Sequence, residues 1–149
     1  MRFLVATAST AALLLCGIAS AEGVAGVTGR WRTERHGALV DIQECRDRSP
    51  CGVLAWAAPA TTRGVVTDQR NPDRSLRRRP LVGLPILWGL TPAKGGWEDG
   101  RLYNPDTGQT FRSSLRLTSA RQLHVTGCLG PLCRTEVWTR VAPSQQKGL

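Results

Sequence analysis

From residue 27 onward, apolar and polar residues alternate with a period of two in short segments separated by turn residues. Such alternation is typical of antiparallel strands that bury one face and expose the other. In the first segment Trp31 falls between Arg30 and Arg32, so these arginines share the opposite face. We therefore predict a first strand that buries its tryptophan and leaves its charges in water.

The same period continues along the chain. Val40 and Ile42 alternate with polar residues, His36 marks the hairpin before them, and further strands are expected at 52–57 and 84–90. Turn residues predict a hairpin around 98–100 and a turn at 104–108, and a final strand is expected at about 134–141. Two very regular strands follow the turn, with these residues on their inner faces: Phe111, Ser113, Leu115 and Leu117, then Leu123, Val125 and Gly127.

Residues 58–80 interrupt the pattern. They contain three prolines, the run Arg77-Arg78-Arg79 and only scattered apolar side chains. Long irregular segments in compact domains are usually either mobile or functional. This stretch is the first place to expect a lid or a binding edge.

The sequence thus predicts an all-β domain of eight or nine strands joined mostly by short turns. A meander of this kind removes its exposed edges when its first and last strands pair, and about eight strands enclose room for one small ligand. We predict an up-and-down antiparallel β-barrel, with a two-sheet sandwich as the alternative. The inward residues expected to line its cavity are Val40, Ile42, Phe111, Leu115, Leu117, Leu123 and Val125.

The first 21 residues have the features of an export signal. Arg2 precedes an uncharged apolar run from Phe3 to Ile18, and Ala19-Ser20-Ala21 supplies the small residues that a signal peptidase accepts. We expect cleavage after Ala21, a barrel domain over residues 22–149, and a soluble periplasmic or secreted protein. A membrane anchor is disfavoured because the run is short for a spanning helix. Lipidation at Cys16 is a minor alternative.

Four cysteines remain after this segment, in two pairs close in sequence. Export to an oxidising space favours disulfides, and we expect Cys45–Cys51 and Cys128–Cys133 because each closes a short loop between strands. Four cysteines allow three pairings. Zinc is disfavoured because the spacings are wider than those of zinc knuckles, and neither pair has the Cys-x-x-Cys spacing of redox sites.

The chain carries 20 basic and 11 acidic side chains, a formal charge of +9, which becomes +8 without Arg2. Nucleic acid is disfavoured as a partner because the aromatic residues are isolated and the chain is expected outside the cytoplasm. An anionic component of the cell envelope, bound by the basic 58–80 stretch, fits that location better. The simplest interpretation is that the arginines only keep the protein soluble.

Motifs that carry catalysis are missing. The chain has two histidines, His36 in a predicted turn and His124 on a predicted outer face, and no nucleophile elbow, zinc-protease motif or phosphate loop. Asp68 could act as a buried carboxylate oriented by Asn71, although such residues beside proline more often cap a turn. We therefore expect no catalytic residues, metal or cofactor.

A set of spaced residues resembles the DUF2147 family, small exported bacterial proteins of unassigned function. The resemblance spans almost the whole of the chain after the expected cleavage point, and Phe111 stands where tyrosine is expected. It rests on Gly29-x-Trp31, Cys45 with Cys51-Gly52, Asp68-x-x-Asn71-Pro72, Leu81-x-Gly83, Trp97-x-x-Gly100-x-x-Tyr103-x-Pro105-x-x-Gly108, Gly127-Cys128-Leu129-Gly130 and Trp138-Thr139-Arg140.

The resemblance implies a lipocalin-like barrel that holds a ligand, and it supplies no catalytic residues. In such barrels a basic side chain near the last strand lies across the tryptophan of the first strand. This implies a structural pair of Trp31 and Arg140, with an exposed Arg140 as the alternative. The leading hypothesis is an exported binding protein for a small apolar or amphipathic ligand. An envelope interaction module and an enzyme of unknown type are the other two, and the oligomeric state stays open.

Overall fold

The computed structural model of the chain describes residues 23–142. The predicted export signal and its cleavage point lie outside this range. Within it the chain forms nine strands, two single-turn α-helices and one 3₁₀ turn, which confirms the prediction of an all-β domain. In chain order the elements are α1 (Val24–Val27), β1 (Gly29–Arg32), β2 (Leu39–Glu44), β3 (Pro50–Trp56), α2 (Pro59–Thr62), η1 (Arg74–Leu76), β4 (Pro85–Trp88), β5 (Thr91–Ala93), β6 (Gly96–Asn104), β7 (Gln109–Ser119), β8 (Gln122–Leu129) and β9 (Leu132–Arg140).

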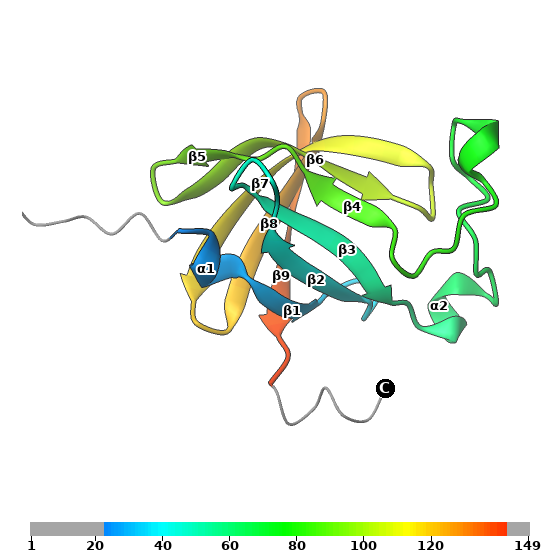
Figure 1. Ribbon diagram of the computed structural model, residues 1–149, viewed down its shortest axis with the longest axis horizontal. Coiled ribbons are helices and arrows are strands. Elements are labelled where there is room, and N and C mark those ends of the chain that lie inside the picture. Colours follow the sequence, from blue (N-terminus) through cyan, green and yellow to red (C-terminus); the bar gives the residue numbers. More distant parts are fainter. Residues whose placement is uncertain (1–22, 143–149) are drawn as a thin grey trace, which may run out of the picture.

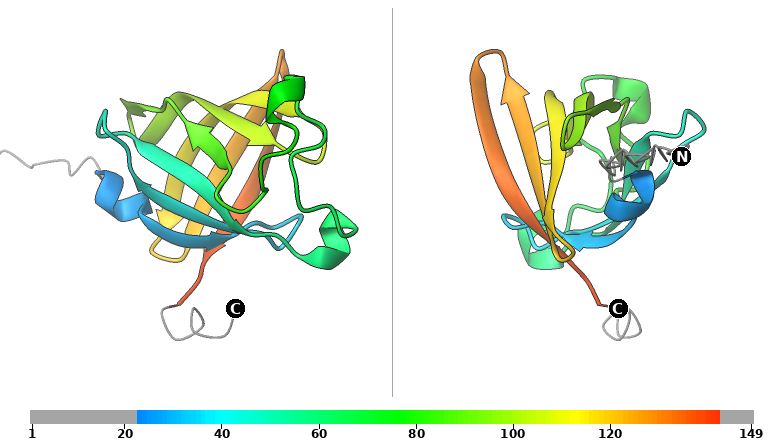
Figure 2. Two further views of the ribbon diagram at one scale, coloured as in Figure 1. Left: turned by 45° about the vertical axis from the view of Figure 1, so that its right-hand side comes forward. Right: turned by 90° about the vertical axis from the view of Figure 1, so that its left-hand side faces the viewer.

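Eight of the strands close into an antiparallel barrel (Figures 1 and 2). The hydrogen-bonded order runs β4-β3-β2-β1-β9-β8-β7-β6, and β4 pairs with β6 to complete the ring. β1 pairs with β9, so the predicted closure between the first and last strands is confirmed. The short strand β5 extends the sheet beyond β6 and lies outside the ring.

Because successive strands run in opposite directions, alternate connections lie at the same end of the barrel. The β2–β3 turn, the β7–β8 turn and the start of β1, preceded by α1, lie at one end, called here the closed end. The β1–β2, β6–β7 and β8–β9 connections, and the long segment between β3 and β4, lie at the other, called the open end.

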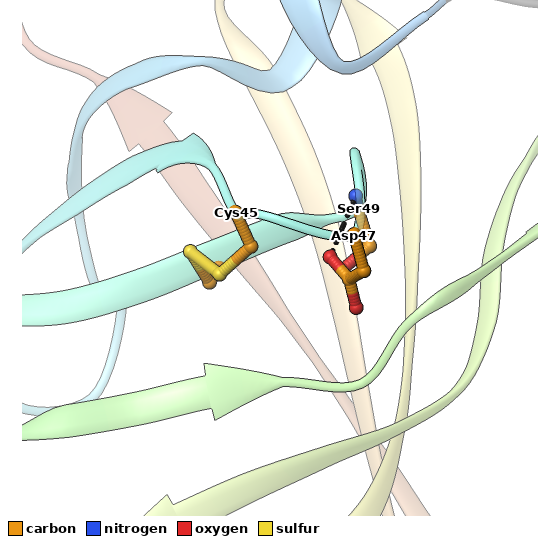
Figure 3. Close-up of a disulfide and its surroundings, with 4 residues drawn as sticks. Cys45, Asp47 and Ser49 are labelled. Carbon is orange, nitrogen blue, oxygen red and sulfur yellow. Dashed lines mark hydrogen bonds between the residues drawn. A yellow bond between two sulfur atoms is a disulfide. The ribbon is translucent and has the colours of Figure 1, made fainter.

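The β2–β3 turn at the closed end is fixed by a disulfide and by a carboxylate (Figure 3). Cys45 bonds to Cys51 across the turn, and the backbone N–H of Cys45 donates to the carbonyl of Ser49. Both the N–H and the hydroxyl of Ser49 donate to Asp47 Oδ1, at 3.0 and 2.7 Å. These hydrogen bonds hold the pKa of Asp47 below its usual value.

Trp31 and Arg140 lock the junction between β1 and β9. The indole of Trp31 is fully buried and donates to the carbonyl of Val27 at 2.8 Å. The Arg140 guanidinium lies 4.2 Å from the centre of the indole, which confirms the pair that the family resemblance implied. The same guanidinium donates to the carbonyls of Gly26, Thr28 and Ala120 at 2.6 to 2.7 Å, so it ties three segments of the closed end together.

Gly29 is required beside this arginine. Its φ of +132° lies outside the range that L-residues readily adopt, and a Cβ atom there would lie 2.7 Å from Arg140 Nη1. The Gly-x-Trp sequence is therefore explained by the space that the guanidinium occupies.

The hairpin predicted around residues 98–100 is wrong. The turn lies at Lys94-Gly95, and β6 continues through the predicted position as a bulge in which Asp99 has a φ of +58°. Asp and Gly have the composition of a turn because both tolerate left-handed backbone, and a bulge requires the same tolerance. Gly100 also leaves room for the side chain of Leu90, which a Cβ atom would meet at 2.5 Å.

Residues 57–84, called here the strap, connect β3 to β4 at the open end of the barrel (Figure 1). α2 and η1 are the regular elements of the strap, and an isolated bridge pairs Thr67 with Pro80. The N–H of Leu81 donates to the carbonyl of Val66, so the outgoing and returning halves of the strap run together. The strap is therefore folded like a hairpin, and it includes residues 58–80, the stretch predicted to be irregular.

Candidate functional site

The barrel holds a cavity of about 190 Å³ at its open end. Its wall is built by the β1–β2 connection, the strap, the β6–β7 turn and the inner faces of the strands around them. The lining residues fall into two chemical groups. The apolar group is Ala38, Val40, Leu54, Ala57, Leu81, Ile86, Leu102, Phe111, Val125 and Trp138, and the polar group includes Thr33, Arg35, His36, Thr61, Thr62, Tyr103, Asn104, Asp106, Arg134 and Glu136.

The apolar group and the charged members of the polar group lie at different depths. Most of the apolar lining is buried, including Val40, Val125 and Trp138, whereas Arg35, Asp106 and Arg134 are exposed. The cavity therefore has an apolar interior and a charged mouth. Ligand sites commonly have this arrangement, in which an apolar interior supplies affinity and a few polar groups fix the orientation of the ligand.

Three of the seven residues expected to line the cavity do so, namely Val40, Phe111 and Val125. The other four are Ile42, Leu115, Leu117 and Leu123, and none of them is among the lining residues. Ile42, Leu115 and Leu123 are buried in the core, and Leu117 is half-buried against it.

All seven lie at inward positions of their strands, as the alternation predicts. Ile42, Leu117 and Leu123 lie nearer to the closed-end turns than Val40 and Val125 do, and Leu115, which pairs with Val125, is buried among core side chains. Trp97 joins them there and is buried. Inward orientation alone therefore does not separate cavity lining from core.

Charged side chains form two contacts at the mouth. Arg35 Nε lies 3.8 Å from Glu136 Oε1, and His36 Nδ1 lies 3.4 Å from Asp106 Oδ2. Each contact joins the β1–β2 connection to a different part of the open end. Both lie at the surface, where water weakens polar contacts, so a ligand can replace them at low cost.

Asp68 is the centre of a buried polar network that fastens the strap to the barrel. Its carboxylate is fully buried and accepts from the Tyr103 hydroxyl on β6 at 2.6 Å. Asn71 Nδ2 donates to it at 2.8 Å, and Arg79 donates through Nε and Nη2 at 3.0 and 2.9 Å. Every one of these partners is a donor, as an ionised carboxylate requires.

The network gives Asp68 and Asn71 structural roles. The side chain of Asn71 also accepts from the N–H of Asp73, which is the turn-capping role considered from the sequence. Asp68 does more than cap a turn, because its bond to Tyr103 joins the strap to the barrel wall. Arg77 Nε donates to the Asn71 carbonyl, as Arg79 Nε does to Asp68. Two arginines of the basic run therefore form hydrogen bonds within the strap.

Tyr103 lines the cavity and binds Asp68, so it couples the cavity wall to the strap. Burial of the phenol is the main cause that raises the pKa of Tyr103 to about 12, and the carboxylate of Asp68 adds to the effect because a phenolate beside it would be repelled. At physiological pH the hydroxyl keeps its proton and donates it to Asp68.

A second contact between strap and barrel depends on Gly108 in the β6–β7 turn. Its φ is +71°, and a Cβ atom there would collide with the backbone carbonyl of Arg70. The turn and the strap therefore meet backbone to backbone at this point. The glycine, the tyrosine and the strap carboxylate all belong to the motifs through which the sequence resembles its family.

Sequence reasoning missed the Asp68–Tyr103 pair and the charged mouth. The first joins residues 35 positions apart, and the second gathers side chains from two connections and β9. One signal was present, since Tyr103 is the single tyrosine of the chain and lies in a family motif. The sequence pattern did not indicate that it faces the strap.

Two disulfides, Cys45–Cys51 and Cys128–Cys133, confirm the favoured pairing and indicate an oxidising compartment. Across residues 23–142, no helix has the length and apolar character to cross a membrane. In the same range, no three His, Cys, Asp or Glu side chains gather as a metal site would require.

Comparisons with known proteins agree with this architecture. One solved structure, "Protein HP1028 from the human pathogen Helicobacter pylori belongs to the lipocalin family", is similar with a TM-score of 0.69 and 22% sequence identity, over 80% of this chain and 86% of that one. A search of curated proteins found no match. The model of the family described as "Uncharacterized protein conserved in bacteria (DUF2147)" matches residues 29–140. The chain therefore belongs to the DUF2147 family and has a lipocalin-like fold.

Proposed function

We propose that the protein binds one small apolar or amphipathic molecule in the open end of its barrel. The observation that carries the proposal is the cavity of about 190 Å³, with buried apolar walls and a charged mouth. An apolar cavity of about 150 Å³ is known to bind one benzene molecule, so this volume suits a single ring or a short acyl chain.

The mouth supports an amphipathic ligand over a purely apolar one. Arg35 and Arg134 offer cationic donors, His36 adds an imidazole, and Asp106 and Glu136 offer acceptors, all around the same opening. A ligand with its tail among Val40, Val125 and Trp138 would place its polar end in this ring. Transfer of the tail from water supplies affinity, and the mouth supplies orientation.

The absence of catalytic residues stays a prediction, and so does export. An oxidising compartment suits a binding protein that meets its ligand outside the cytoplasm. The fold adds to this argument, because lipocalin-like barrels are built as containers and their interior is accessible from one end.

Calorimetric titration with octanoate tests the proposal. Octanoate has a short apolar tail and a carboxylate, and we expect saturable binding of one molecule per chain to the unmodified protein. Val125→Trp adds bulk to the cavity wall and is expected to weaken binding at least tenfold. Thr118→Trp adds the same side chain at an exposed position toward the closed end of β7 and should leave binding unchanged.

Ala57→Trp guards against an unfolded Val125→Trp variant, because Ala57 is a half-buried lining residue at the strap and tolerates bulk more easily. Equal octanoate binding by the parent chain and both cavity variants would refute the proposal, as would no binding at all. Native mass spectrometry of protein purified from a bacterial host would then identify any retained molecule by its mass.

A further inference from the structure

The β8–β9 hairpin ends in an exposed apolar tip, defined here as residues 129–132. Leu129 is 49% exposed and Leu132 is 76% exposed, and Gly130 and Pro131 between them are also exposed. The Cys128–Cys133 disulfide joins the two strands directly behind the tip. Two leucines are therefore held in water on a cross-linked hairpin, although apolar side chains of this size usually contribute to a core.

The tip stands at the open end of the barrel. The β8–β9 turn shares this end with the β1–β2 and β6–β7 connections, which line the cavity mouth. In both views of Figure 2 the hairpin rises above the rest of the barrel, and it is the highest point of the ribbon in Figure 1. The tip therefore belongs to a hairpin that also contributes Gly127 and Arg134 to the cavity lining.

The charged residues nearest to the tip are two arginines, and Glu136 is the first acidic residue beyond them on β9. Arg112 pairs with Cys128 on the neighbouring strand, and Arg134 follows the disulfide on β9; both side chains are exposed. Residues 109–112 and 126–135 contain these two arginines and no acidic residue. The chain as a whole carries a formal charge of +9. An apolar projection with a basic collar matches an anionic bilayer surface, where acyl chains lie beneath negative headgroups.

We propose that the tip docks the open end of the barrel onto an anionic lipid bilayer. Leu129 and Leu132 enter the boundary between headgroups and acyl chains, and Arg112 and Arg134 bind headgroup phosphates. A bilayer fits this tip better than a protein partner does, because a narrow convex hairpin offers far less than the roughly 800 Å² per partner that a stable protein interface buries. Insertion of the leucines and attraction of the arginines to headgroups are two weak contributions. Together they give reversible membrane binding, and either one alone gives little.

Vesicle flotation with the full chain tests this proposal. Vesicles of phosphatidylcholine with 30% phosphatidylglycerol are compared with vesicles of phosphatidylcholine alone. We expect at least tenfold stronger binding to the anionic vesicles, a tenfold loss in the double variant Leu129→Ser, Leu132→Ser, and a similar loss in Arg112→Gln, Arg134→Gln. All variants carry the same residues 1–22, so differences between them report the substitutions alone.

A matched control removes exposed apolar side chains elsewhere. Val66 and Val82 on the strap are 72% and 61% exposed, and the double variant Val66→Ser, Val82→Ser should bind like the parent. In a second readout, Leu132→Trp should gain tryptophan fluorescence that phospholipids with brominated acyl chains quench. Because position 132 is exposed, none of these tip changes threatens folding.

Equal binding by the tip variant and the valine control would overturn the proposal, and so would equal binding to neutral and anionic vesicles. Failure to bind either vesicle would also overturn it and would leave a protein partner as the occupant of the tip. Octanoate titration without vesicles keeps the two proposals separate. The Leu129→Ser, Leu132→Ser variant should bind octanoate like the parent, so its loss of membrane binding does not bear on the cavity.

Discussion

The two ends of the barrel are closed in different ways. At the closed end, side chains such as Trp31, Ile42 and Leu115 fill the interior, and Arg140 fastens the strands around it. At the open end, a hydrogen-bond network centred on Asp68 fastens the strap to the barrel, and the cavity lies at this end. Side-chain packing and the hydrogen bonds of Arg140 stabilise the closed end, whereas a buried carboxylate fastens the strap at the open end, where the cavity lies. The same alternation of apolar and polar residues can therefore build both a filled core and an open cavity.

The largest expected effect comes from removing the centre of the closed end. Trp31→Ala deletes a fully buried indole, its hydrogen bond to Val27 and the surface on which Arg140 rests. We expect the free energy of unfolding to fall by about 3 to 5 kcal/mol, as for other large-to-alanine changes in cores. Urea denaturation measures this. A change below about 1 kcal/mol would show that the closed end is not the stable half of the barrel.

Asp68→Asn tests the open end. The amide keeps the size of the side chain but loses its charge, so Arg79 and Tyr103 lose a charged acceptor. We expect a loss of about 2 to 3 kcal/mol, the scale of hydrogen bonds to a buried charged group. Hydrogen exchange should accelerate in the strap and stay slow in β7–β9.

Hydrogen exchange in Asp68→Asn tests whether the network acts on the strap separately from β7–β9. Exchange that rises equally in β7–β9 and in the strap would contradict a separate role for the Asp68 network. The exposed Asp73, which caps η1 by accepting from Ser75, provides the control. Asp73→Asn removes the same charge from the surface of the strap, and exchange in the rest of the strap should change little.

A matched pair on β8 compares the two ends within one strand. Leu123 and Val125 are buried, point inward and are two residues apart, but only Val125 lines the cavity. Leu123→Phe overpacks a filled core and should cost about 1 to 3 kcal/mol. Val125→Leu adds one methylene beside the cavity and should change the stability by less than about 0.5 kcal/mol, because space is present. Thermal unfolding of the two variants measures the difference, and equal destabilisation would contradict a hollow open end.

The smallest effect is spectroscopic and concerns Tyr103. Because it is the single tyrosine of the chain, the absorbance of phenolate at 295 nm reports it alone. We expect a midpoint near pH 12, above the ordinary value of 10, because burial and Asp68 disfavour the phenolate.

The sign of the linked effect on stability follows from this shift. The folded protein holds the proton more tightly than the unfolded chain does. The contribution of Tyr103 is therefore complete below pH 10 and is lost as the pH rises toward 12. Tyr103→Phe should remove this part of the alkaline pH dependence, and Asp68→Asn should lower the absorbance midpoint. A midpoint near 10 in the parent chain would contradict the buried network.

Much of the barrel could be predicted from the sequence because the signals are local. Alternation identified the inward faces of β1, β2, β7 and β8, and short cysteine spacings identified both disulfides. The bulge at Asp99 was misread because turns and bulges favour the same residues. The pairing of Trp31 with Arg140 joins opposite ends of the chain, and the resemblance to a family supplied it.

The candidate site was harder to predict, because it depends on the level of each side chain along the barrel axis. Strand tilt and stagger set that level, and the period of two contains no information about them. This is why Val125 and Leu123 looked equivalent in sequence. The role of Asp68 was equally hidden, since its partners Arg79 and Tyr103 resemble a surface charge and an ordinary strand residue.

The most direct test of the account is methyl NMR of the protein during titration with octanoate. Val40, Leu54 and Val125 line the cavity, whereas Ile42, Leu115 and Leu123 fill the closed end, so their methyl groups report the two ends separately. We expect saturable shifts of the methyl signals of the first set, with those of the second set nearly unchanged. Shifts that are absent, or that spread equally over both sets, would contradict a binding cavity at the open end.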